Sequence, residues 1–273
     1  RTAVVAIGAF LGNFTVGHIP ANDLYVTGRV TKREANIIDT CFCTTSIALL
    51  LLFANATGMI ASWGKVFLIT ALAVYVVTAV IVRIPPLSRV SDDYYEGTEP
   101  DPELNVRTNI FSEAFQTGVA VAAKAPNPFK ACLMSGVRAL IMVAAIHVSA
   151  VATWVLPALV HKYTPIFVWL GNVFLPVLKV VGMPNAAELS QAIGLSFVNP
   201  ISATVGLGAL DLAPAARLFA ATFAAPIVIF FGAFLSSLYS TKVPVKFTHV
   251  LLIWFERALL TSVFLGIICR FFA

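Results

Sequence analysis

Charged residues are scarce in this chain of 273 residues. Asp, Glu, Lys and Arg together make up 11% of it, apolar residues make up 59%, and the mean hydropathy is +0.90. A water-soluble globule needs far more charge to cover its surface. Several apolar runs reach the roughly 20 residues that a helix needs to cross a bilayer core about 30 Å thick. The composition therefore excludes a soluble catalytic domain and predicts an all-α integral membrane protein.

The sequence also lacks the motifs of catalysis and of cofactor binding. It has no His/Cys group at metal-ligand spacing, no phosphate-binding loop and no serine elbow. Gly206 and Gly208 do not form a dinucleotide fingerprint, because the third glycine is missing. The four cysteines are expected to be buried apolar thiols rather than a disulfide or metal site: Cys41, Cys43, Cys132 and Cys269. We expect no enzyme and no bound cofactor, while a coupling cation, Na⁺ or H⁺, stays open.

Basic residues flank the apolar runs instead of forming a stripe with interleaved aromatic residues. The net charge of +5 therefore reflects membrane topology, and no nucleic-acid partner is expected. Lys32 and Arg33 precede the first run, and Arg83 and Arg89 follow the second. The two runs are predicted to form a transmembrane hairpin. Because cytoplasmic loops are rich in Lys and Arg, the start of the first run and the end of the second are predicted to lie on the cytoplasmic side.

The apolar runs predict a polytopic bundle of about five full spans plus re-entrant segments. The first two spans are separated by a tight turn at Ser62–Lys65. Lys242 and Lys246 place the loop before the last span on the cytoplasmic side. The predicted spans are about Ile37–Gly58, Val66–Val82, Ala139–Leu159, Ala215–Leu238 and Phe247–Phe271.

A polar segment divides the chain into three parts. Residues 84–136 form a cytoplasmic loop, whose Ile110–Lys124 stretch has helical spacing of apolar residues and predicts an interfacial amphipathic helix. Residues 1–83 hold a broken N-terminal segment and the first hairpin. Residues 137–273 form a second transmembrane domain.

Two apolar segments are interrupted by proline, glycine and polar residues. The first interruption lies near Gly12–Pro20, and the second divides Glu188–Leu210 at Asn199–Pro200. A third apolar segment, Pro165–Gly182, is too short for a full crossing. Such breaks indicate unwound helices around a solute site at the bilayer midplane. We expect the two breaks to approach each other and to bind substrate through Asn13, Thr15 and His18 on one side and Glu188, Ser190, Gln191, Asn199, Ser202 and Thr204 on the other. The alternative is that these side chains only cap helix ends.

Glu256 and Arg257 lie about ten residues into the last apolar run. A charge at the centre of a membrane helix costs about 2.5–3.5 kcal/mol. The pair therefore either couples to solute or to neighbouring helices, or anchors the helix at the interface. Adjacent residues point about 100° apart on a helix, so each is expected to pair with a different helix.

Four strings of the sequence resemble the YjiH-type membrane proteins, which contain the nucleoside-recognition or Gate domain. They are Val30-Thr31-Lys32-Arg33-Glu34-Ala35, Arg83-Ile84-Pro85-Pro86-Leu87-Ser88-Arg89 with Tyr94-Tyr95-Glu96-Gly97, and Tyr163-Thr164-Pro165-Ile166-Phe167. The resemblance implies a membrane domain of broken helices that works with a second Gate-containing subunit. Longer members carry further N-terminal helices, and a chain that opens at Arg1 in an apolar stretch is expected to begin inside a longer protein.

The sequence thus predicts a transporter, or a transporter subunit, for a small polar solute such as a nucleoside-like compound or an amino-acid derivative. The alternative is a non-transporting scaffold that assembles a partner Gate-domain protein. The expected partners are the lipid bilayer, the solute, and a second Gate-containing subunit, the chain's own missing N-terminal helices or further copies of the chain. The expected location is the bacterial inner (plasma) membrane.

Overall fold

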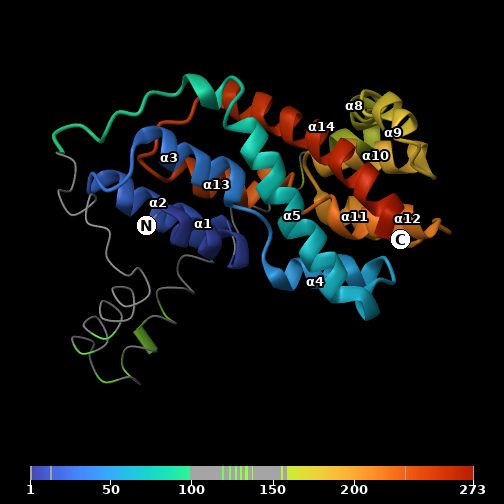
Figure 1. Cartoon of the computed structure of the whole chain (residues 1–273), viewed down its shortest axis with the longest axis horizontal. Coiled ribbons are helices and arrows are strands. Elements are labelled where there is room, and N and C mark those ends of the chain that lie inside the picture. The colour runs from blue at the N-terminus through green and yellow to red at the C-terminus, as the bar shows by residue number, and fades with distance from the viewer. Residues whose placement is uncertain are drawn as a thin grey trace.

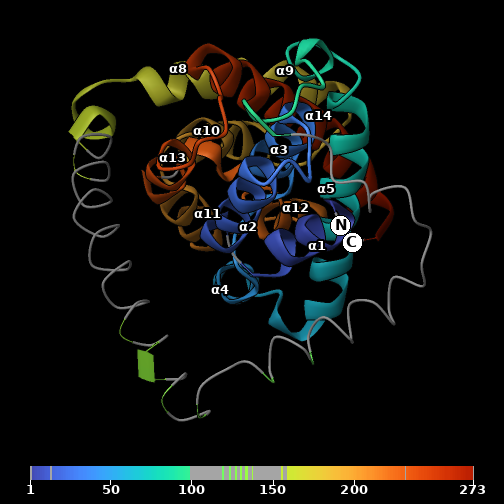
Figure 2. The same cartoon turned by 90° about the vertical axis from the view of Figure 1, so that its left-hand side faces the viewer.

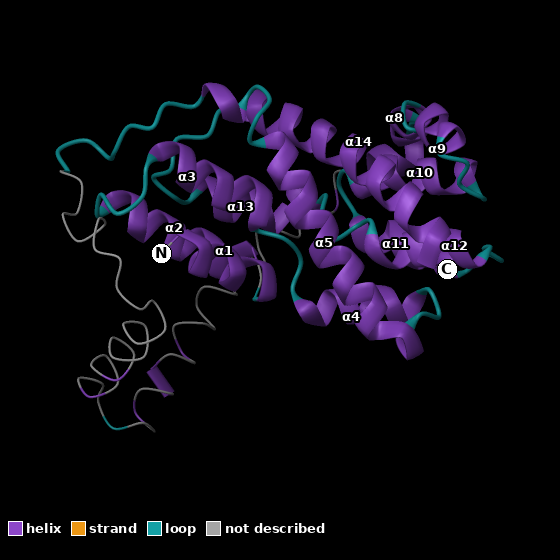
Figure 3. Cartoon of the chain, viewed as in Figure 1, coloured by secondary structure: helices purple, strands orange, loops and turns teal. Residues whose placement is uncertain are grey.

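The computed structural model describes residues 2–12, 14–98, 159–230 and 232–272, with isolated positions between 119 and 155. These residues form helices and turns and contain no strand, which confirms the all-α class for them (Figure 3). The helices are α1 (Thr2–Leu11), α2 (Phe14–Val26), α3 (Lys32–Ile37), the π-helical turn η1 (Ile38–Phe42), α4 (Ile47–Ala56), η2 (Ile60–Ser62), α5 (Trp63–Ile81), η3 (Leu87–Arg89), α8 (Ile166–Asn172), α9 (Leu175–Val180), α10 (Ala186–Ser196), α11 (Pro200–Gly208), α12 (Pro214–Thr222), η5 (Val228–Phe230), α13 (Gly232–Tyr239) and α14 (Phe247–Phe272).

Three helical segments are long and apolar enough to cross a membrane. They are Lys32–Ala56, Ile60–Ile81 and Phe247–Phe272. The chain is therefore a helical membrane protein. The expected span Ala139–Leu159 and the expected amphipathic helix Ile110–Lys124 lie outside the described residues, so the count of five spans stays a prediction.

The two long helices α5 and α14 pack against each other and run in opposite directions. Lys65 Nζ, at the start of α5, donates a hydrogen bond of 2.8 Å to the carbonyl of Phe272 at the end of α14. On α5 the buried residues Val66, Ala73 and Val77 follow the helical period, and the opposite side carries exposed large apolar residues. The exposed side suits contact with lipid.

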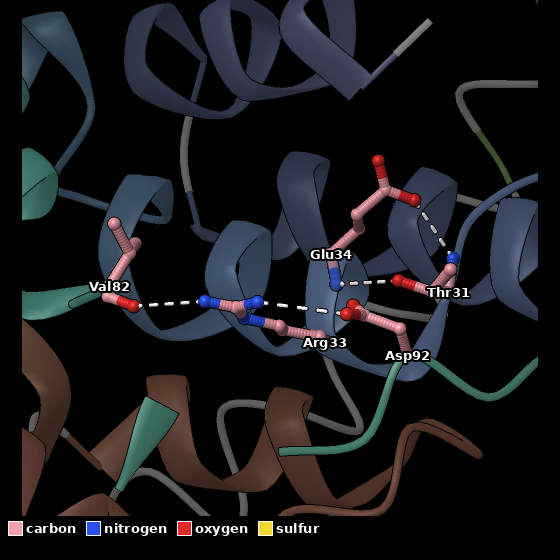
Figure 4. A network of polar contacts seen from close by, with 5 residues as sticks. All are labelled: Thr31, Arg33, Glu34, Val82 and Asp92. Atoms are coloured by element: carbon pink, nitrogen blue, oxygen red, sulfur yellow. Dashed lines mark hydrogen bonds and ion pairs between the residues drawn. The ribbon is translucent and has the colours of Figure 1, made fainter. Parts of the chain in front are cut away.

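A polar network joins the first and second spans at one end (Figure 4). Thr31 and Glu34 form a capping box at the start of α3, with Glu34 N donating to Thr31 Oγ1 and Thr31 N donating to Glu34 Oε2. Arg33 Nη2 donates to the carbonyl of Val82 over 3.1 Å, and Arg33 Nη1 lies 3.6 Å from the carboxylate of Asp92. The start of the first span and the end of the second therefore lie on the same side, as a hairpin requires.

The turn of this hairpin lies earlier than the sequence predicted. Gly58 adopts a φ of +71°, and Met59 N donates to the carbonyl of Ala54, which closes the end of α4. Glycine takes this left-handed conformation without steric cost. The prediction of a turn at Ser62–Lys65 was wrong, because Gly64 lies inside α5.

The predicted span Ala215–Leu238 is not one helix. Helix α12 ends at Thr222, and α13 begins at Gly232, with a 3₁₀ turn (Val228–Phe230) between them. Pro226 lies in this connection and cannot donate a helical hydrogen bond. The predicted break in Glu188–Leu210 is found, since α10 ends at Ser196 and α11 begins at Pro200.

Two groups of short helices flank the long helices (Figure 1). The N-terminal group consists of α1, α2, α3, η1 and α13, which contact one another. The C-terminal group consists of α8, α9, α10 and α11, and α12 connects it to α4 and α14. Figure 2, viewed from the left-hand side of Figure 1, shows α13 beside α2, although the two helices are far apart in the sequence.

Candidate functional site

The first membrane span is interrupted in the middle. Helix α3 continues into η1, where Cys43 N donates to the carbonyl of Ile38 in the five-residue step of a π turn. Residues Cys43–Ser46 are then non-helical, until Ser46 Oγ accepts from Leu49 N and caps α4. Short hydroxyl side chains compete with helical backbone bonds, and the sequence here is Cys-Thr-Thr-Ser. The prediction of a continuous Ile37–Gly58 helix was therefore wrong.

The break is stabilised by residues from other helices. Arg257 of α14 donates from Nη1 to the carbonyl of Thr40, which lies in the last turn before the break. His18 Nε2 of α2 lies 3.4 Å from the carbonyl of Asp39. Backbone groups freed inside a membrane must be satisfied by protein or enclosed water. A cation at the carbonyl end of a helix is also favoured by the helix dipole.

Four ionisable side chains gather at this break, and we call them the polar cluster: His18, Asp39, Cys43 and Arg257. The first three have no exposed surface, and Arg257 is 2% exposed. Ser237 of α13 fixes the imidazole, with Ser237 Oγ 2.9 Å from His18 Nδ1. The His18 ring also packs nearly perpendicular to the ring of Phe234, with 4.8 Å between the ring centroids.

The carboxyl group of Asp39 is the least satisfied group of the cluster. Neither of its oxygen atoms has a hydrogen-bond partner among the described residues. Among the described residues, an ionised carboxylate would be buried without a hydrogen-bonded ion pair, because Arg257 is directed to the carbonyl of Thr40, and a protonated carboxyl group would have no acceptor for its O–H. Both states are costly in a membrane interior, where ionisable residues mark pathways for ions and solutes. The position is therefore suited to a polar or cationic ligand.

Sequence prediction named two members of this cluster, His18 and Arg257. Asn13 lies outside the described residues, and so does the side chain of Thr15. Glu256 is half-buried beside Arg257, and its Oε2 atom has no partner among the described residues. Of these two adjacent residues, Arg257 is the one with a hydrogen bond to the backbone at the break in the described part of the chain.

The other predicted site residues lie in the C-terminal group. Glu188, Gln191 and Ser202 line an open pocket of about 200 Å³, together with His161 and Phe167. All three polar side chains are exposed. The pocket is a surface feature, unlike the enclosed polar cluster.

Two further predicted residues act locally on their own helices. Asn199 Oδ1 accepts from Ser202 N over 2.9 Å and caps α11, and Ser190 Oγ donates to the carbonyl of Ala187. Thr204 is buried, and its hydroxyl has no partner among the described residues. The capping alternative therefore accounts for Asn199, whereas Ser190 bonds to a carbonyl within its own helix.

The two predicted sides of the site are not brought together. His18 packs among α2, η1 and α13, whereas Glu188 and Gln191 belong to α10, which packs on α8 and α11 (Figure 1). The expectation of one joint pocket was wrong, because the break that faces His18 is the one at Cys43–Ser46.

Sequence analysis missed Asp39, Cys43 and Ser237. Asp39 carried a signal, because it is a carboxylate inside a long apolar run. Cys43 was taken as an apolar thiol, and nothing in the sequence connects Ser237 with a site more than two hundred residues earlier.

Comparison with known proteins adds one distant relative. The chain is 26% identical over 264 residues to an uncharacterized protein of Alkalihalophilus pseudofirmus, and the match covers 96% of this chain. The chain spans 57% of the length of that relative. No known protein-family profile matches the chain, and no solved structure does.

Proposed function

We propose that this protein transports a small polar solute across a membrane, through a site at the interruption of its first span. The observation that carries the proposal is the buried polar cluster at Cys43–Ser46. Unwound backbone at membrane depth is tolerated where it lines a cavity or binds a substrate, and transporters place their sites there. A bacterial inner membrane is the proposed location.

The cluster has the parts that recognition of a polar solute requires. It combines a hydrogen-bonding imidazole, a carboxyl group that has no hydrogen-bond partner in the described part of the chain, and a guanidinium group, all deeply buried. Helix α4 also begins at the break, so its first backbone N–H groups point towards it. Nucleosides and amino-acid derivatives carry donors and acceptors that suit such groups, and they are the solutes we propose to test first.

A scaffold that only assembles a partner subunit is the alternative. Such a protein gains nothing from a buried carboxyl group that the described residues leave without a partner, because replacing it with an apolar residue would stabilise the fold. The cluster therefore favours transport over a scaffold.

The experiment is solute uptake by the purified chain in proteoliposomes, over a panel of nucleosides, amino-acid derivatives and cations. We expect uptake of one class above that of protein-free vesicles. His18→Gln should reduce this uptake, and His161→Gln should not, because His161 lines the open pocket of the C-terminal group. Equal uptake by vesicles with and without protein for every class would favour the scaffold.

A further inference from the structure

Three potential metal ligands converge where α2 meets the interrupted span. His18, Asp39 and Cys43 each place one ligand atom within 4.8 Å of the other two, and all three side chains are buried. Around a tetrahedral zinc ion, whose bonds are about 2.0–2.3 Å long, ligand atoms lie roughly 3.3–3.8 Å apart. Small changes of side-chain torsion would bring the three ligand atoms to this spacing.

The donor atoms select a class of metal. Imidazole nitrogen and thiolate sulfur suit zinc and ferrous iron, whereas magnesium and calcium take oxygen ligands. One donor of each kind, from His18, Asp39 and Cys43, makes a mixed set of nitrogen, oxygen and sulfur.

The imidazole of His18 is oriented as it is in metal-binding histidines. These residues usually donate the N–H that faces away from the metal to an oxygen atom. Ser237 Oγ lies 2.9 Å from His18 Nδ1, and Nε2 faces η1, 3.4 Å from the carbonyl of Asp39. The contact with the Asp39 carbonyl places the imidazole proton on Nε2, since a carbonyl oxygen only accepts. A bound metal would favour the other tautomer, in which Nδ1–H donates to Ser237 Oγ and the Nε2 lone pair faces the side where Asp39 and Cys43 lie.

Charge balance also suits a divalent cation. The Asp39 carboxyl group has no partner among the described residues, and a metal would supply one. The Asp39 carboxylate and the Cys43 thiolate together neutralise a divalent ion; binding releases the thiol proton to water and, where the Asp39 carboxyl group is protonated beforehand, the carboxyl proton as well. The other nearby cation, Arg257, is directed to the carbonyl of Thr40.

The geometry points to a binding site for one divalent transition-metal cation, of the zinc and ferrous-iron class, formed by His18, Asp39 and Cys43. Three protein ligands leave a tetrahedral ion with one open position, as in sites that exchange a water or a substrate. The inference goes beyond the proposed function, because metal binding is an equilibrium property of the folded chain whether or not a solute moves.

Cobalt binding to the purified chain, without a polyhistidine tag, tests the site. Co²⁺ substitutes for zinc and is visible by absorption. We expect saturable binding of one Co²⁺ per chain, with the visible bands of a tetrahedral ion and a thiolate-to-cobalt charge-transfer band. X-ray absorption of the Zn²⁺-loaded wild-type chain should show a single sulfur ligand at about 2.3 Å.

Single substitutions separate the ligands from their neighbours. Cys43→Ser should abolish the charge-transfer band, and Asp39→Asn and His18→Gln should each weaken Co²⁺ binding by more than about tenfold, as second-shell changes alone cost 10–100-fold. Cys41→Ser is the matched control, because Cys41 is an equally buried thiol two residues earlier that is not part of the set. It should leave the spectrum unchanged.

Two outcomes overturn the inference. One is an absence of saturable Co²⁺ binding by a monodisperse wild-type chain, and the other is a zinc ligand shell without sulfur. Because these measurements use no transport, they are independent of the uptake experiment. Metal binding without uptake of any solute would leave the site standing and refute the transport proposal, and uptake without metal binding would do the reverse.

Discussion

Two helix breaks of this protein differ in how their freed backbone groups are satisfied. At the α10–α11 break, Asn199 caps α11 and its own N–H donates to the carbonyl of Leu195, so the break is satisfied by neighbours in sequence. At the Cys43–Ser46 break, Arg257 comes from the last helix of the chain and His18 from α2. A break whose backbone groups bond to neighbours in the sequence needs no ligand to satisfy them. A break that brings together charged side chains from distant helices is a candidate solute site.

The largest expected difference is between the carboxylate of Asp39, at the first break, and that of Glu188, in the first turn of α10. Asp39→Asn should lower solute uptake at least about tenfold, because a hydrogen bond to a charged group is worth about 1.5–3 kcal/mol. Glu188→Gln should leave uptake within about twofold, since an exposed polar contact contributes less than about 0.5 kcal/mol. Initial rates in proteoliposomes with equal protein content measure both. A larger loss of uptake in Glu188→Gln than in Asp39→Asn would instead assign the solute site to the C-terminal group.

Two arginines that each donate to a backbone carbonyl test the stability of the break. Arg257→Ala should lower the free energy of unfolding by about 1–3 kcal/mol, because it leaves the buried carbonyl of Thr40 without this donor. Arg270 donates to the carbonyl of Val181 but is exposed, so Arg270→Ala should cost less than about 0.5 kcal/mol. Thermal unfolding in detergent compares them. Equal destabilisation would mean that Arg257 does not support the break.

The first break also depends on close packing by Gly17. A Cβ atom at this position would lie 2.5 Å from Cys43 Sγ and 2.5 Å from Ala9 Cβ. Gly17→Ala should therefore destabilise the protein by about 1–3 kcal/mol and displace the Cys43 thiol. Gly8→Ala is the control, because a Cβ there meets nothing within 4 Å. An unchanged melting temperature and unchanged Co²⁺ spectrum in Gly17→Ala would contradict the packing described.

The smallest effect is expected at the second break. Asn199→Ala removes the N-cap of α11 and should cost about 1 kcal/mol of stability. Uptake per folded molecule should stay the same, and Asn199→Asp, which keeps an acceptor, should restore the stability. Thermal unfolding and uptake on the same preparations separate the two effects. A loss of uptake without a loss of stability would assign Asn199 to the solute site.

Much of the helical layout could be predicted from hydropathy and helix breakers. The last helix, expected at Phe247–Phe271, is observed as Phe247–Phe272, and the interruption expected at Asn199–Pro200 is observed between α10 and α11. The break at Cys43–Ser46 was missed because it contains neither proline nor glycine. Thr44, Thr45 and Ser46 are only weak helix breakers, and the surrounding apolar residues concealed them.

The site was predictable only in part, because its residues come from separate places in the chain. Arg257 stood out as a charge within an apolar helix. Its partner is the carbonyl of Thr40, and backbone carbonyls carry no sequence signal. Asp39 had the same kind of signal as Arg257, but it was overlooked within a run that was interpreted as a plain span.

A structure of the protein with its transported solute would show at which of the two helix breaks the solute binds. We expect solute density at the Cys43–Ser46 break, in contact with Asp39 and His18, and no density in the pocket lined by Gln191 and Ser202. Density in that pocket, with the polar cluster closed by protein alone, would contradict the account and place the site in the C-terminal group.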